Sequence, residues 1–187
     1  MYLKKLIDAQ QTVFTVDDLQ QVWQIENRDY LKTVISRLFK SGKIIRAKRG
    51  IYALNERFDI YELANKIKQP SYVSLETVLQ KENIIFQDYG QTVFSVANNS
   101  VEITIGEKTF KYSKISDDVL YAPVGIINGI ASKERAIADR VYLTPDYFFD
   151  NLRTVDVRKL KAISKLYNKR TQEEIKKIIK FIKTNYA

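Results

Sequence analysis

The 187-residue chain is 45% hydrophobic and 12% aromatic, which excludes a disordered chain and allows one large domain or two small ones. It has neither cysteine nor histidine, which excludes disulfides, thiolate metal sites and histidine bases. The net charge of +9 is uneven, with 11 basic and 6 acidic residues in 1–57, 9 and 13 in 58–150, and 11 and 3 in 151–187. Basic ends favour a polyanionic partner, although such charge also serves solubility.

Three helices are expected at the start of the chain. Apolar residues at helical spacing indicate the first over residues 2–9. Thr15 is a suitable N-cap for the second, with Asp17 and Asp18 in its first turn. Asn27 caps the third, over residues 28–40, and Gly42 ends it. The apolar stripe expected to be buried on this third helix consists of Tyr30, Leu31, Val34, Ile35 and Leu38.

A β-hairpin is expected over residues 43–54, with Gly50 at its tip. Three helices and a hairpin predict a winged helix-turn-helix domain over residues 1–57, in which the third helix enters the major groove. The exposed N-terminal half of that helix offers Arg28, Lys32, Thr33 and Ser36 for contact with bases or phosphates, beside Asp29. The wing offers cations for phosphates, namely Lys43, Arg46, Lys48 and Arg49.

Two other interpretations remain open for these residues. Charges on an amphipathic helix are commonly a solvated face, and edge strands carry lysine to prevent aggregation. Winged helices also dock proteins, so the predicted fold does not by itself establish DNA binding.

The remainder, residues 58–187, predicts a second, α+β domain. Residues 58–69 form a connecting helix that begins at Asp59 and ends before Pro70, and Ser74 caps the next helix. Period-two segments predict a small antiparallel sheet from strands 92–97, 101–105 and 109–115, with another strand within 125–132. Ser132 caps a helix over residues 133–143. Two basic helices, 157–167 and 172–185, end the chain, as a packed pair with a solvated face or as a second basic surface.

No pattern in the sequence indicates catalysis. There is no glycine-rich phosphate loop, nucleophile elbow or carboxylate cluster at metal spacing. Asp117 and Asp118 fit a turn, and Glu134 and Asp139 fit structural roles, Asp139 paired with Arg135 or Arg140 on its own helix. We therefore expect a protein that is not an enzyme, without cofactor or metal. Without a signal-peptide pattern or an apolar run of ~20 residues, we expect a cytoplasmic protein with no membrane partner.

Over nearly its whole length the chain resembles the AbiEi-type antitoxins of bacterial abortive-infection loci. The resemblance rests on the N-terminal helices and hairpin and on four segments: RGIYAL (49–54), PSYVSLETVL (70–79), GEKTFKYSKI (106–115) and IASKERAIADRVYL (130–143). None of these segments is a catalytic signature.

The resemblance implies two functions. The N-terminal domain would bind inverted repeats in its own promoter and repress the operon, with Arg37 added to the DNA contacts. The C-terminal domain would neutralise a nucleotidyltransferase-like toxin that protects against phage, without a stable complex, as in type IV systems.

Two alternative functions remain. One is a winged-helix regulator whose C-terminal half senses a ligand or dimerises, and the other is an adaptor that binds protein or RNA. Because one recognition helix covers few base pairs, repression requires two copies on one operator. Without a coiled-coil seam in the sequence, we expect a monomer in solution that cooperates on DNA.

Overall fold

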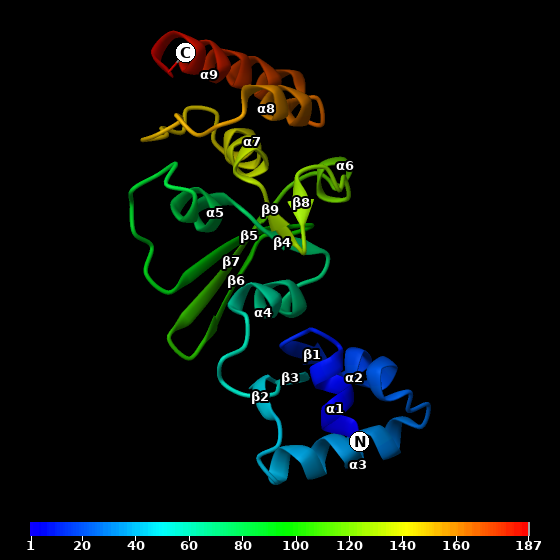
Figure 1. Ribbon diagram of the computed structural model, residues 1–187. Helices are drawn as coiled ribbons and strands as arrows, with labels where there is room; N and C mark the ends of the chain where they lie inside the picture. The colour runs from blue at the N-terminus through cyan, green and yellow to red at the C-terminus, as the bar shows by residue number, and fades with distance from the viewer. Residues whose placement is uncertain (187) are drawn as a thin grey trace. The chain divides into compact units, whose positions relative to one another are not determined.

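The structure is a computed structural model that describes residues 1–186 (Figure 1). The chain divides into two compact units, Met1–Ile67 and the residues from Lys68 onward. The first unit contains a small antiparallel sheet, and the second contains a larger mixed sheet followed by C-terminal helices. The mixed α+β class expected from the sequence is therefore confirmed.

The first unit packs helices α1, α2 and α3 around one apolar core. Leu6, Phe14, Leu19, Trp23 and Leu31 lie in this core with exposures of 3% or less. Its sheet has the order β1-β3-β2, and both strand pairs are antiparallel. The elements of this unit are α1 Tyr2–Asp8, β1 Val13–Thr15, α2 Val16–Trp23, α3 Arg28–Lys40, β2 Ile45–Lys48, β3 Ile51–Ala53 and α4 Ile60–Ile67.

Local sequence signals set the ends of these helices. Thr15 and Asp18 form a reciprocal capping box at α2, and the Asn27 carboxamide accepts from the N–H groups of Asp29 and Tyr30 at α3. Gly42 and Gly50 take φ values of 68° and 82°, as the end of α3 and the hairpin tip require. The predicted caps and the predicted hairpin are thus confirmed, whereas the short strand β1 was not predicted.

Helix α4 belongs to the first unit, so the units divide after Ile67 and not at the expected boundary after residue 57. The Glu62 carboxylate accepts from the N–H of Thr12 at 2.7 Å and from the N–H of Val13 at 3.2 Å. Lys66 pairs with Asp18 at 2.8 Å. Partial burial opposes the ionisation of Asp18, but hydrogen bonds from Lys66 and Thr15 hold its pKa below the ordinary value. These contacts with β1 and α2 are what fix α4.

The second unit is built on a six-stranded sheet of order β6-β7-β5-β4-β9-β8. The pairs β5–β7 and β4–β9 are parallel, and the other three pairs are antiparallel. The strands are β4 Ser71–Val73, β5 Thr92–Ala97, β6 Val101–Ile105, β7 Lys108–Lys114, β8 Ile126–Ile127 and β9 Ile130–Ala131.

This sheet is larger than the expected small antiparallel one, and it is mixed. The segment 98–100 carries the chain past the end of β7, where the Ser100 hydroxyl accepts from the N–H of Lys114 at 3.0 Å. Strand β7 therefore lies between β5 and β6 and runs parallel to β5. Strand β4 was not predicted because its three residues are too few to show a period.

Helices cover one side of this sheet in two successive layers (Figure 1). Helices α5 and α7 pack against each other next to the strands, and α8 and α9 pack on α7. The segment at Asp117, expected to be a turn, is a short helix. The helices of this unit are α5 Leu75–Lys81, α6 Asp117–Leu120, α7 Lys133–Leu143, α8 Val157–Ser164 and α9 Lys169–Tyr186.

Candidate nucleic-acid interface

The outward face of α3 carries the predicted helix contacts. Lys32, Thr33, Ser36 and Arg37 are exposed and line a shallow depression of about 760 Å³. Lys40 and Ser41, at the C-terminal end of the helix, line it too and were not among the predicted contacts. Since they follow at helical spacing from Ser36 and Arg37, continuing the period would have found them.

Two predicted contacts on α3 have acidic neighbours. Arg28 lies 3.8 Å from the Asp17 carboxylate, and Lys32 lies 3.0 Å from the Asp29 carboxylate. Both pairs are largely exposed, and such pairs contribute at most about 1 kcal/mol each. The Thr33 hydroxyl donates to the Asp29 carbonyl at 2.9 Å. These weak contacts leave Arg28 and Lys32 available to a stronger anion.

The hairpin is linked to α3 by one stacked arginine. The Arg46 guanidinium on β2 lies 4.7 Å from the ring centroid of Phe39 on α3 and 5.8 Å from that of Tyr52 on β3. Arg46 therefore fixes the base of the hairpin beside the C-terminal end of α3. Among the predicted DNA contacts, Arg46 therefore also has a structural role, because it packs on Phe39 and Tyr52.

The remaining cations of the predicted site lie on α3 and within residues 43–49. Among residues 1–186, no ion pair forms at Arg37, Lys43, Lys48 or Arg49. Arg37, Lys43 and Arg49 are exposed, and Lys48 is half-buried. The structure thus gathers Lys32, Thr33, Ser36 and Arg37 on one helix face and carries the wing cations on the adjoining hairpin.

Tyr30 differs from its expected place in the buried stripe of α3. Its side chain is 48% exposed, and its hydroxyl lies 3.2 Å from the hydroxyl of Tyr2 on α1. Of the other stripe residues, Leu31, Val34 and Ile35 are buried, as expected, and Leu38 is half-buried against the core. Tyr30 is therefore an exposed aromatic side chain near the N-terminal end of α3, beside the predicted contacts.

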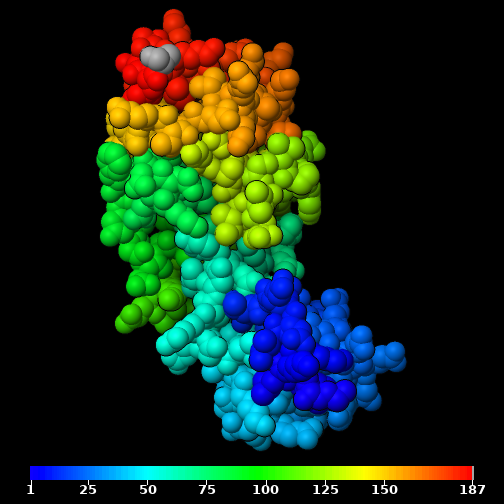
Figure 2. Space-filling model, viewed as in Figure 1, coloured from blue at the N-terminus to red at the C-terminus, as the bar shows by residue number. Residues whose placement is uncertain are grey.

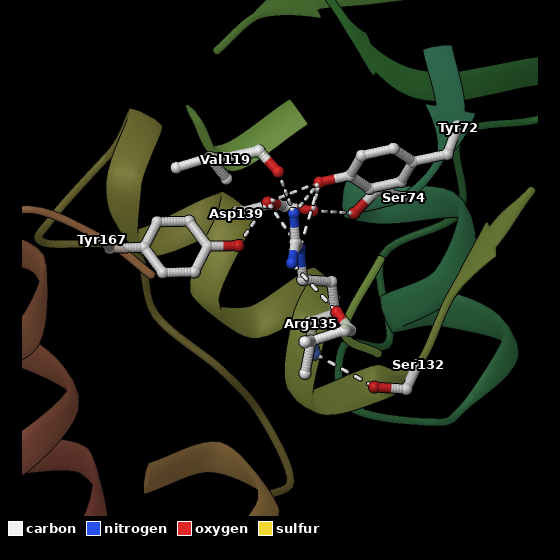
Figure 3. A network of polar contacts seen from close by, with 8 residues as sticks. Tyr72, Ser74, Val119, Ser132, Arg135, Asp139 and Tyr167 are labelled. Atoms are coloured by element: carbon white, nitrogen blue, oxygen red, sulfur yellow. Dashed lines mark hydrogen bonds and ion pairs between the residues drawn. The ribbon is translucent and has the colours of Figure 1, made fainter. Parts of the chain in front are cut away.

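In the second unit, the strongest polar cluster is a buried network centred on α7 (Figure 3). Arg135 and Asp139 are both 0% exposed and lie 3.5 Å apart. The Asp139 carboxylate also accepts hydrogen bonds from the hydroxyls of Tyr72 at 3.0 Å, Ser74 at 2.7 Å and Tyr167 at 2.6 Å. The network therefore ties β4 and the segment before α9 to α7.

The other Arg135 contacts complete this network. Its guanidinium donates to the Val119 and Val124 carbonyls at 2.6 and 2.9 Å and to the Tyr72 hydroxyl at 2.9 Å. Burial lowers the pKa of Arg135, but Tyr167, Asp139 and Tyr72 outweigh it and raise that pKa. Burial and the nearby Asp139 raise the pKa of both Tyr72 and Tyr167, so both phenols remain proton donors.

This network is structural because its charges are committed to partners inside the unit. Burial raises the pKa of Asp139, against the opposing effects of Arg135 and the three hydroxyl donors. The expected pairing of Asp139 with Arg135 is confirmed. Ser74 sits at the N-cap position of α5, yet its hydroxyl serves Asp139 and makes no capping bond.

Residues 1–186 contain no group of three or more acidic side chains placed to hold a metal ion. None of the described helices combines the length and apolar character that crossing a bilayer requires.

Comparison with known proteins finds no family model that matches this chain and no matching curated protein.

Proposed function

We propose that the first unit is a winged helix-turn-helix that binds duplex DNA. Helix α3 would lie in the major groove, and the hairpin β2–β3 would act as the wing on the phosphate backbone. The observation that carries the proposal is the positive charge of Arg37, Lys43, Lys48 and Arg49, on one helix face and the adjoining hairpin, which forms no ion pair among residues 1–186. Cations without an acidic partner release counterions on contact with phosphates, which supplies affinity.

Specific binding would come from the helix and not from the wing. Arg28 is suited to a bidentate contact with guanine, and Lys32, Thr33 and Ser36 lie within the same exposed face. A helix of 13 residues reads only a few base pairs. We therefore propose that two monomers bind inverted repeats and repress the operon that encodes this chain.

The test is binding of the full chain to its own upstream duplex and to a scrambled duplex at physiological salt. The variant Lys43→Ala/Lys48→Ala/Arg49→Ala keeps Arg46, which packs on Phe39, and removes three wing cations. It should bind about 10- to 100-fold more weakly, and its logarithmic salt slope should fall by about three.

A matched control removes three cations from the second unit, in the variant Lys165→Ala/Lys176→Ala/Lys180→Ala. This control should bind the upstream duplex like wild type. Equal losses in both variants, or no preference of wild type for its own upstream DNA, would show that the first unit is not a DNA reader.

The resemblance to AbiEi-type antitoxins supports a second, non-enzymatic role for the other unit. We propose that it counters a nucleotidyltransferase-like toxin. The network of Tyr72, Ser74, Arg135 and Asp139 joins two of the segments that carry the resemblance, 70–79 and 130–143, so these segments act in folding. Growth rescue during co-expression with a toxin from a neighbouring gene tests this role, and failure of rescue would favour a ligand-sensing regulator instead.

A further inference from the structure

A pocket of about 480 Å³ opens between α8, α9 and the segment before α8, within the second unit. Four cationic side chains line it: Arg153, Arg158, Lys161 and Lys183. They come from three different parts of the chain, which helix packing brings together. Figure 2 shows α8 and α9 side by side, in orange to red.

This pocket carries an excess of positive charge. Within the described part of the chain, no carboxylate lines the pocket and none of its four cations forms an ion pair. The nearest acidic residue in sequence, Asp156, caps α8 by accepting from the N–H groups of Arg158 and Lys159 at 2.8 and 3.0 Å. The backbone N–H of Lys159 lowers the pKa of Asp156 most, desolvation opposes it, and the N–H of Arg158 and the positive charges of Lys159 and Arg158 lower it further. Asp156 is thus engaged by the N-terminus of α8 and offsets part of the Arg158 charge.

The rest of the lining is apolar and aromatic. Val155 and Ile182 are 7% and 6% exposed and form a buried floor. The ring of Tyr186 lies 5.7 Å from the Arg153 guanidinium and 6.1 Å from the ring of Phe181. A planar ligand could therefore stack against Tyr186 or Arg153, while the cations of α8 and α9 face its charged end.

We propose that this pocket binds a nucleoside polyphosphate. Its phosphates would contact Arg158, Lys161 and Lys183, and its base would stack at Tyr186 and Arg153, over the floor of Val155 and Ile182. The volume lies within the roughly 300–1,000 Å³ of small-molecule sites, and the apolar floor is unnecessary for a purely phosphate-binding groove. The site does not depend on DNA binding by the first unit, and it would make the second unit a sensor of nucleotide levels.

The experiment is calorimetric titration of the full chain with ATP, AMP, adenosine and inorganic triphosphate in metal-free buffer. ATP should bind more tightly than AMP, and adenosine should not bind. The pocket variant Arg158→Ala/Lys161→Ala/Lys183→Ala should lose about five-fold in ATP affinity per cation, or about 100-fold in all.

Three further measurements make the test specific. The variant Lys165→Ala/Lys176→Ala/Lys180→Ala removes the same charge from helix ends and faces outside the pocket and should bind ATP like wild type. The single variant Lys183→Glu should weaken ATP binding even if the triple variant folds poorly. The pocket variant should keep wild-type affinity for the upstream duplex.

Three results would overturn the proposal. The first is that wild type binds neither ATP nor triphosphate. The second is that wild type and the pocket variant bind ATP equally well. The third is that the pocket variant loses duplex DNA binding while wild type binds no nucleotide. The last of these would assign the surface to a polynucleotide. Failure of DNA binding by the first unit would leave the nucleotide result unchanged, so the two proposals fail separately.

Discussion

At the scale of single residues, the second unit contains a fully buried ion pair, Arg135 with Asp139, on which its stability depends. Arg135 and Asp139 are four apart on α7, so their pairing could be predicted from sequence spacing. Their complete burial could not, because it depends on Tyr72 and Ser74, more than 60 positions earlier, and on Tyr167. A buried ion pair contributes little net stability while intact, but removing one partner leaves an uncompensated charge.

We expect Asp139→Asn to destabilise the protein by about 3–5 kcal/mol, because it leaves the Arg135 guanidinium buried without a counter-charge. Urea unfolding, followed by circular dichroism, measures the change. The control Asp118→Asn alters an exposed carboxylate and should shift stability by less than about 0.5 kcal/mol. A loss below about 1 kcal/mol for Asp139→Asn would mean that Asp139 is already protonated in the folded protein.

At the scale of elements, α3 and the hairpin β2–β3 are two separate elements that carry the candidate DNA contacts. Their types and limits follow from local signals, namely the Asn27 cap, the glycines at 42 and 50 and the apolar period. The stacking of Arg46 on Phe39 joins the two elements and has no local signal, because it forms between side chains on different elements. The sequence therefore predicts which elements carry the candidate residues, but not how α3 and the hairpin are fixed together.

Binding to duplex DNA should distinguish these two elements. Lys48→Ala/Arg49→Ala should weaken binding to every duplex by a similar factor, because the wing is expected to contact phosphates. Arg28→Ala and Thr33→Ala should instead reduce the preference for the upstream sequence, by about 1–3 kcal/mol of discrimination each. Competition binding with single-base operator variants measures both quantities. Identical, sequence-independent losses from all four changes would contradict a division between helix and wing.

At the scale of the whole molecule, the chain consists of two units, each with its own sheet. The change of charge near residue 58 suggested a boundary there, but α4 is held in the first unit by Glu62 and Lys66. Charge composition does not reveal such contacts, since they join α4 to β1 and α2 some 50 residues earlier. The boundary between the two units is therefore set by these contacts between distant residues, and not by the change in charge.

Truncation tests this boundary. A fragment of residues 1–67 should unfold cooperatively on heating, whereas a fragment of residues 1–57 should be markedly less stable. The shorter fragment lacks α4 and leaves the N–H groups of Thr12 and Val13 without the Glu62 acceptor. Thermal unfolding monitored by circular dichroism compares the two. Residues 68–187 should fold alone, and equal melting temperatures for the two N-terminal fragments would place the boundary at residue 57 after all.

The sequence by itself determined the longer helices and the strands β5, β6 and β7, where Thr15, Asn27 and Ser132 cap helices, and where positive charge collects, but not the short elements β1, β4 and α6. Those features depend on neighbours within a few positions, which the sequence shows directly. Only the tertiary structure decided the mixed order of the six strands, the burial of Arg135 with Asp139, and the pocket that joins Arg153 to Lys183. Each of these depends on residues distant in sequence, whose proximity comes from packing of the whole unit.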